Sequence, residues 1–169
     1  MCIISNSYPD LLYDWNQENS FLKYKRKAFV DETLRDGMQG ASLKKKPNQK
    51  EKRAILKEVL ALHPSEITLG FPAAEDDSLF LAQQAKELHP NGEYGLIART
   101  VESDIRAVLK VRELTKLQNI HLNLFVGISP IRTSIERWKI SELAANVEKM
   151  TSFACSGVTS RIISGADLL

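Results

Sequence analysis

The chain has 169 residues, of which 43% are apolar and 26% charged, a composition that is typical of a globular domain and excludes a disordered chain. Its 23 basic and 21 acidic side chains give a formal net charge of +2, which is too balanced to favour nucleic acid or a membrane surface as a partner. No apolar run approaches the roughly 20 residues of a membrane span, and residues 1–6 lack the basic and long apolar regions of a signal peptide.

Residues 1–26 show no periodic pattern and are interpreted as an N-terminal leader, whereas short β-rich runs alternate with helical patterns over residues 27–169. This alternation is typical of βαβ units on a parallel sheet. Asn48, with Glu51 completing a capping box, and Ser141 are the expected N-caps of two helices. In chain order we predict a strand at 28–31, a lysine-rich loop, a helix at about 48–62, a strand at 66–69, a helix at 76–88, a strand at 94–98, a helix at 102–114, a strand at 120–126, a helix at 141–154 and a weaker strand at 159–163.

The spacing of these strands indicates the fold. Successive strands lie about 25 to 35 residues apart, which is the length of one β/α unit in a TIM barrel. A whole barrel needs about 250 residues, so this chain has room for about five units. We therefore predict an α/β fold, an incomplete (β/α)8 TIM barrel with about five strands and four to five helices, over residues 27–169.

The segment that follows the first predicted strand carries the clearest chemical signal. In parallel α/β folds the carboxyl ends of the strands are where ligands bind, and residues 33–37 occupy such a position. Asp36 can coordinate a hard divalent cation through oxygen. Arg35 can hold a carboxylate or stabilise an enolate oxygen with its planar donors. The alternative is that Arg35 and Asp36 only pair with each other and that Asp-Gly makes a turn.

A longer string favours the functional interpretation. It is Asp31-Glu32-Thr33-Leu34-Arg35-Asp36-Gly37-Met38-Gln39. It resembles the first-strand signature Asp-Thr-Thr-Leu-Arg-Asp-Gly-x-Gln of the superfamily of isopropylmalate, homocitrate and citramalate synthases, hydroxymethylglutaryl-CoA lyase and pyruvate carboxyltransferase domains. Only Glu32 departs from that signature. Three further segments follow in the order that the family expects, at 70–74, 97–100 and 125–131, and the Gly-Phe-Pro of the first favours the synthase branch.

The resemblance, which covers about residues 27–160, implies a Claisen-type condensation of acetyl-CoA or another acyl-CoA with a 2-oxo acid. It implies that Asp36 is a ligand of a divalent metal (Mg, Mn or Zn) and that Arg35 stabilises the enolate. Gln39 would help to define the acyl-acceptor site. Arg99 would bind the carboxylate of the 2-oxo acid, and Ser129 would lie at the top of the fourth strand.

The three histidines are less easily interpreted. His63 and His89 both precede a proline at a helix end and are expected on the surface. His121 lies in the fourth strand and by alternation shares a face with Asn123 and Phe125. It can therefore point into the barrel, either as a core residue with a hydrogen-bonding partner or in direct contact with substrate.

The sequence also departs from the family pattern. The His-x-His pair that completes the family's metal site would lie beyond residue 169. Thr68 occupies the place where the family carries a glutamate on the second strand, in the polar cluster around Arg35, and threonine cannot balance the arginine's charge. Arg132 stands where the synthases tend to have histidine and adds positive charge near the active face.

Three functions remain open. The chain is a condensing enzyme, a non-catalytic remnant that acts as a binding module, or one half of a split barrel whose partner bears His-x-His. A homodimer or a complementing C-terminal half is therefore an expected partner, alongside acyl-CoA and the 2-oxo acid. The two cysteines form no metal-binding cluster, and we expect reduced thiols in a cytoplasmic protein with no membrane or nucleic-acid partner.

Overall fold

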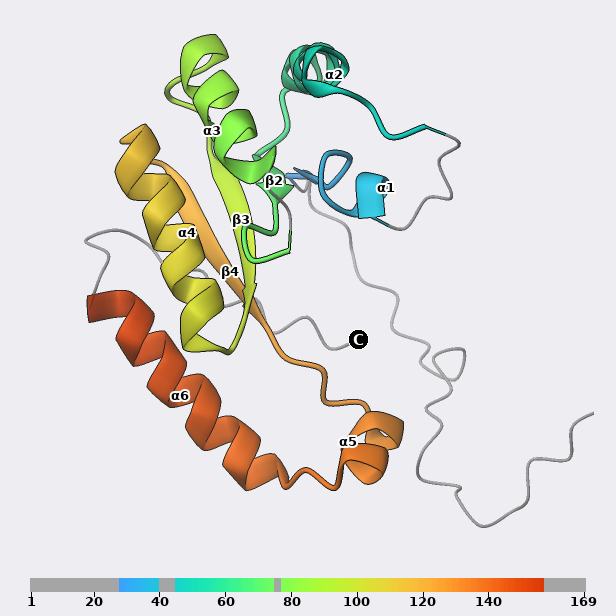
Figure 1. Ribbon diagram of the computed structural model, residues 1–169, viewed down its shortest axis with the longest axis vertical. Coiled ribbons are helices and arrows are strands. Elements are labelled where there is room, and N and C mark those ends of the chain that lie inside the picture. Colours follow the sequence, from blue (N-terminus) through green and yellow to red (C-terminus); the bar gives the residue numbers. More distant parts are fainter. Residues whose placement is uncertain (1–27, 40–44, 75–76, 157–169) are drawn as a thin grey trace, which may run out of the picture.

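The computed structural model describes residues 28–39, 45–74 and 77–156 (Figure 1). Its four strands pair in parallel in the order β1-β2-β3-β4, and the helices follow them in the chain. The strands are β1 (Val30–Asp31), β2 (Glu66–Gly70), β3 (Tyr94–Arg99) and β4 (Ile120–Phe125). The helices are α1 (Asp36–Gln39), α2 (Gln49–Ala61), α3 (Asp77–Leu88), α4 (Glu102–Thr115), α5 (Pro130–Glu136) and α6 (Ile140–Ser156).

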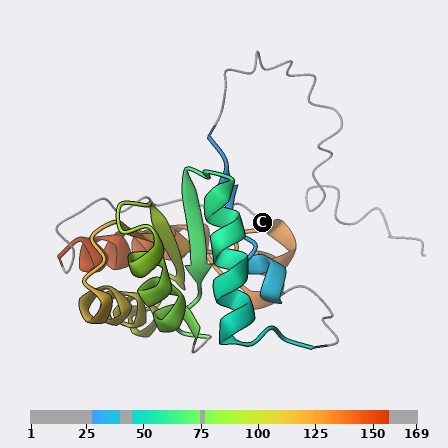
Figure 2. The same ribbon diagram turned by 90° about the horizontal axis from the view of Figure 1, so that it is seen from above.

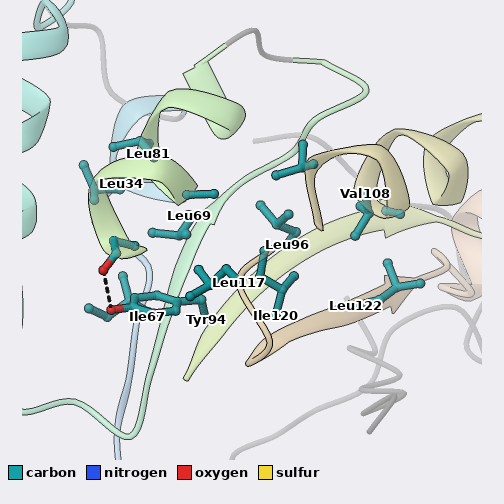
Figure 3. Close-up of a cluster of buried hydrophobic side chains, with 14 of the residues drawn as sticks. Leu34, Ile67, Leu69, Leu81, Tyr94, Leu96, Val108, Leu117, Ile120 and Leu122 are labelled. Carbon is teal, nitrogen blue, oxygen red and sulfur yellow. Dashed lines mark hydrogen bonds between the residues drawn. The ribbon is translucent and has the colours of Figure 1, made fainter. Parts of the chain in front are cut away.

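One face of the sheet is apolar and covered by helices. Alternate residues of each strand point to this face, where α3 packs on β2 and α4 packs on β3 and β4. Helices α2, α3 and α4 lie side by side in Figures 1 and 2, and α6 packs against α4. Figure 3 shows part of the resulting core. The buried apolar strand residues are Ile67, Leu69, Tyr94, Leu96, Ala98, Ile120, Leu122 and Leu124.

The opposite face of the sheet, which is the interior of a barrel, carries polar side chains. The Asn123 side chain of β4 donates through Nδ2 to Oε1 of Glu66 on β2, over a distance of 3.0 Å that spans β3. The bond passes over Gly95, where a Cβ atom would lie 2.8 Å from Asn123 Nδ2 and still closer to Glu66 Oε1. Glycine at this position therefore lets two strands that are not neighbours share a hydrogen bond.

The fold agrees with the α/β, partial TIM barrel that the spacing predicted, and the predicted cap at Asn48 is confirmed. The Asn48 side chain accepts from the Glu51 backbone N–H at 3.0 Å, and the Glu51 carboxylate accepts from the Asn48 N–H at 2.7 Å. The prediction of Ser141 as an N-cap was wrong, because α6 already begins at Ile140. The leader at 1–26 and the strand at 159–163 lie outside the described residues.

Two short helices were not predicted. The carbonyl of Glu32 accepts from the N–H groups of Arg35, Asp36 and Gly37, and this turn continues into α1 where we expected only a loop. Helix α5 begins after Ser129 with Pro130 at its first turn, a start signal that the sequence contains.

Within the part of the chain that the structure describes, none of the helices is both long enough and apolar enough to cross a membrane.

We expect Gly95→Ala to lower the free energy of unfolding by about 1 to 3 kcal/mol, because the added methyl group separates Glu66 from Asn123 and leaves both without their partner. Denaturant unfolding followed by circular dichroism measures this change. Gly37→Ala is the control, since a Cβ there meets its nearest atom, Thr33 Cγ2, at 3.9 Å. Equal stabilities of the two variants would contradict the role of Gly95.

Candidate functional site

Charged and aromatic side chains gather at the carboxyl ends of the four strands. Arg35 and Asp36 follow β1, Phe71 follows β2, Arg99 ends β3 and Phe125 ends β4. Because all four strands are parallel, these ends lie along one edge of the sheet. This edge is where parallel α/β proteins bind their ligands.

The loop after β1 is fixed by local contacts. The Asp31 carboxylate accepts from the Thr33 backbone N–H at 3.0 Å and from the Thr33 hydroxyl at 3.1 Å, which closes a tight turn. Leu34 is buried in the core and so attaches the loop to the rest of the fold. With Thr33 and Leu34 held in this way, Arg35 and Asp36 are presented at the edge of the sheet.

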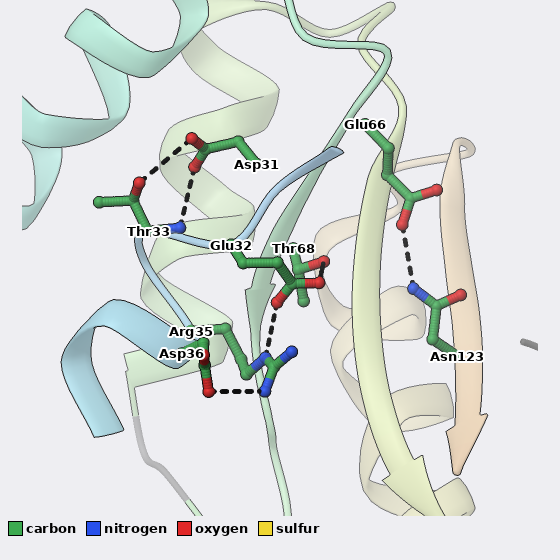
Figure 4. A network of polar contacts seen from close by, with 8 residues as sticks. All are labelled: Asp31, Glu32, Thr33, Arg35, Asp36, Glu66, Thr68 and Asn123. Atoms are coloured by element: carbon green, nitrogen blue, oxygen red, sulfur yellow. Dashed lines mark hydrogen bonds and ion pairs between the residues drawn. The ribbon is translucent and has the colours of Figure 1, made fainter. Parts of the chain in front are cut away.

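Arg35 lies in a network of polar contacts that joins the loop to β2 (Figure 4). Its Nε donates to Glu32 Oε2 at 2.6 Å, and its Nη1 donates to Asp36 Oδ1 at 3.1 Å. The other Glu32 oxygen, Oε1, accepts from the hydroxyl of Thr68 at 2.9 Å. Glu32 and Thr68 are two of the positions that depart from the family pattern, and here they contact each other. The carboxylate that balances Arg35 is therefore supplied by Glu32.

Asp36 is a single oxygen donor at the edge of this network. Its side chain is 70% exposed, and its ion pair is with Arg35. The described residues contain no group of three or more His, Cys, Asp or Glu side chains that could hold a metal ion. Since a catalytic metal site usually takes several protein ligands, Asp36 alone does not fit a divalent ion.

Arg99 is held by a neighbouring helix. Its Nε and Nη2 donate to the two carboxylate oxygens of Asp104, at 2.7 and 3.0 Å, and its backbone N–H donates to the same group. Asp104 is 2% exposed whereas Arg99 is 57% exposed, so the buried carboxylate orients a guanidinium that faces solvent. The hydrogen bond from Arg99 lowers the pKa of Asp104, and the same bond raises the pKa of Arg99.

Two aromatic rings border Arg99. The guanidinium carbon lies 5.7 Å from the centre of the Phe71 ring, and the Phe71 ring meets the Phe125 ring edge-on at 5.9 Å between centres. Gly70, with φ of 151°, has a backbone conformation that favours glycine and allows the chain to turn from β2 into Phe71. The result is a cationic group beside an apolar wall at the carboxyl end of the sheet.

The other predicted site residues lie in different surroundings. Gln39 is the exposed last residue of α1. Ser129 is the N-cap of α5, and its hydroxyl oxygen accepts from the Arg132 backbone N–H at 3.2 Å. Arg132 lies over the ring of Trp138, with its guanidinium carbon 5.2 Å from the ring centre. Of the predicted residues, Arg35 and Asp36 are in direct contact with each other.

His121 lies near the other end of the sheet, as the second residue of β4 and beside Gly95 in register. It is buried, and its Nε2 contacts the carboxylate of Glu93, which immediately precedes β3. Its Nδ1 is buried with no hydrogen-bonding partner among the described residues. The contact with Glu93 supports the interpretation of His121 as a core residue with a partner.

Comparison with known proteins establishes the family. The HMGL-like family matches this chain over residues 26–165. The chain belongs to the HMGL-like family. Its described residues thus form part of that family's TIM barrel, as the string at 31–39 indicated, and members of the family generally depend on a divalent metal.

A curated relative makes the match more specific. The 2-isopropylmalate synthase of Streptococcus gallolyticus (strain UCN34) is 32% identical to this HMGL-like chain over 121 residues. The aligned region covers 72% of this chain and 22% of the synthase. The chain therefore spans about a fifth of the length of this relative.

Several residues of the site were not identified from the sequence. Phe71 belongs to the Gly-Phe-Pro segment but was not assigned a role, and Glu66 was assigned only to a strand. The alternation of Glu66 with Thr68 along β2 is the signal that places both on the interior face. The contact of Glu32 with Thr68 joins residues 36 positions apart, which no local pattern reveals.

We expect the stabilising effect of Asp104 to depend on pH. Because the pKa of Asp104 is lowered in the folded chain, its contribution is present above about pH 4, the usual range of an unfolded aspartate, and is lost as the pH falls through the folded-state pKa. The difference in unfolding free energy between wild type and Asp104→Asn should therefore be largest near neutral pH and shrink in acid.

Urea unfolding at a series of pH values measures this difference. The matched control is Glu102→Gln, which removes the exposed ion pair with Arg106 from the same helix and should change stability little at any pH. A difference for Asp104→Asn that stays constant down to pH values below its folded pKa would contradict the proposed linkage.

Proposed function

We propose that this chain contributes the first part of an active site that condenses an acyl-CoA with a 2-oxo acid. The observation that supports this most directly is the pair of guanidinium groups, Arg35 and Arg99, at the carboxyl edge of one parallel sheet. Each is oriented by a carboxylate, Glu32 or Asp104, that is itself tied to the fold. Two oriented cations suit a substrate that has a carboxylate and also develops negative charge on a second oxygen.

The reaction uses both features. The methyl group of acetyl-CoA loses a proton, the resulting enolate forms a carbon–carbon bond to the ketone carbon of the 2-oxo acid, and the ketone oxygen takes up a proton. Water then cleaves the thioester, which releases coenzyme A as a free thiol. The name of the relative contains the product 2-isopropylmalate. To form that product from acetyl-CoA, the 2-oxo acid has to be 3-methyl-2-oxobutanoate.

The residues of the chain divide these tasks. The exposed side of Arg99 would bind the substrate carboxylate, with Phe71 and Phe125 as an apolar wall beside it. Arg35 would stabilise the enolate or alkoxide oxygen, and Gln39 and Ser129 would border the acyl-acceptor site. Asp36 would offer one oxygen ligand to a divalent metal, and the other ligands would have to come from outside the described residues.

A second possibility is one half of a split barrel, completed by another polypeptide or by a second copy of this chain. The described residues provide Asp36 as one metal donor at the edge of the sheet and contain no cluster of three, so in this case the complementing segment would supply the remaining metal ligands. In this case the same 2-oxo acid binds at Arg99, but thiol release requires the complementing segment. A non-catalytic remnant would show neither binding nor turnover.

We expect Arg99→Gln to weaken binding of 3-methyl-2-oxobutanoate by about 10- to 100-fold, because an ion pair with a charge-assisted hydrogen bond is lost. Titration of the substrate, followed by nuclear magnetic resonance of the chain, measures the affinity. Arg106→Gln is the matched control, since Arg106 is also paired with an acid on α4 but its guanidinium lies over the ring of Phe153 on α6. Equal affinities of wild type and Arg99→Gln would contradict this assignment.

We expect Arg35→Gln to leave binding of the 2-oxo acid nearly unchanged and to lower the rate of thiol release from acetyl-CoA by about 100- to 1,000-fold, because the donor to the developing oxyanion is removed. Thiol release is followed with a chromogenic disulfide, in the full chain with added Mg²⁺ or Mn²⁺. Thiol release in Arg35→Gln at the wild-type rate would contradict the role of Arg35.

A further inference from the structure

The side chain of Glu32 connects two elements that are distant in the sequence. One carboxylate oxygen accepts from Arg35 in the loop after β1, and the other accepts from the hydroxyl of Thr68 on β2. Thr68 is fully buried, so its hydroxyl needs a partner within the protein, and Glu32 provides it. The carboxylate is therefore fixed at both oxygens.

This arrangement determines how Arg35 is held. The bond from Arg35 Nε to Glu32 is shorter than the bond from Nη1 to Asp36, at 2.6 against 3.1 Å, and Asp36 is much more exposed than Glu32. Glu32 is thus the main anchor of the guanidinium. Asp36 is a weaker partner, which leaves its carboxylate able to exchange Arg35 for another ligand.

We infer that Glu32 is the positioning residue of Arg35 and that Thr68 anchors Glu32 to β2. The two side chains are interchangeable: a threonine at position 32 with a glutamate at position 68 would hold Arg35 in the same way. What Arg35 does once it is positioned rests on the proposed function. The positioning itself does not, because it follows from the contacts of Glu32, Arg35 and Thr68 alone.

The exchange is sterically reasonable. Thr68 Oγ1 lies 2.9 Å from Glu32 Oε1. The carboxylate oxygens of a glutamate at position 68 would lie about two bonds beyond the place of Oγ1. They would therefore reach the region that the Glu32 carboxylate now occupies. The adjacent position on β3 is Gly95, which has no side chain to contact Thr68, and the space above this glycine holds the Glu66–Asn123 pair. A threonine at position 32 would then supply the hydroxyl.

The experiment is a nuclear magnetic resonance measurement on the full chain labelled with ¹⁵N-arginine, in which each ordered guanidinium gives its own Nε–Hε signal. The Arg35 signal is assigned by its loss in Arg35→Lys. In Glu32→Thr we expect this signal to move to the position of exposed arginines and its Hε to exchange with water about tenfold faster or more, as for the loss of one charge-assisted hydrogen bond. In Glu32→Thr/Thr68→Glu we expect the shift and the slow exchange to return.

Two further variants separate positioning from packing. Thr68→Val keeps the shape but removes the hydroxyl, and we expect faster exchange of Arg35 Hε, whereas Thr68→Ser should behave as wild type. The Arg99 signal, held by Asp104, reports in every variant that the fold is intact. Glu32→Ala replaces Glu32→Thr if the latter does not fold, and it should also release Arg35 because alanine has no acceptor.

An unchanged Arg35 signal in both Glu32→Thr and Glu32→Ala would overturn the positioning role of Glu32. Failure of the double exchange to restore the signal, with the Arg99 signal intact, would overturn the claim that the two positions are interchangeable. These signals require no turnover. Absence of thiol release in the wild-type chain would therefore count against the proposed function and leave this inference standing.

Discussion

The interaction on which the candidate site depends is the carboxylate of Glu32, held between Arg35 and Thr68. Strand β1 pairs with β2 over only two residues, Val30 and Asp31, so backbone pairing alone does little to fix the loop that follows it. Burial of Leu34 and the bond from Thr68 to Glu32 attach this loop to the rest of the sheet. Without them, Arg35 would be a long side chain on a loop with no defined direction.

The two faces of the sheet explain why such a contact is possible. Residues on the helix-covered face are apolar and form the core, whereas the other face also carries polar residues, which reach across strands to one another. Asn123 meets Glu66 above Gly95, and Thr68 meets Glu32 next to the same glycine. The small residue in the middle strand thus permits polar contacts on a face that a barrel would enclose, where unpaired polar groups are costly.

Much of the fold could be predicted from the sequence, because hydrophobic periodicity and capping residues are local signals. The capping box at Asn48 depends on residues three positions apart, and the Arg35-Asp36 string is contiguous. Ser141 was misassigned because a good capping residue can also occupy the first turn of a helix, as it does in α6. Helix α5 is only seven residues long and buries none of them, so it lacks the long apolar stripe by which the other helices were predicted.

The site itself was predicted as separate residues and not as contacts. Arg99 and Asp104 are five positions apart, and both were visible in one segment, but the buried position of Asp104 depends on the packing of α4 against β3. Glu32 and Thr68 each look like an independent departure from the family pattern when they are read along the chain. Their contact depends on the register of β1 with β2, which brings positions 36 residues apart together.

The most direct measurement is a double-mutant cycle on Glu32 and Thr68, in which urea unfolding gives the free energy of wild type, Glu32→Ala, Thr68→Val and the double variant. If the Glu32 carboxylate is anchored by the Thr68 hydroxyl, the two changes should be coupled by about 1 kcal/mol or more. Additive effects, within about 0.3 to 0.5 kcal/mol, would show that the two side chains act independently and would contradict the anchoring of the site through Glu32.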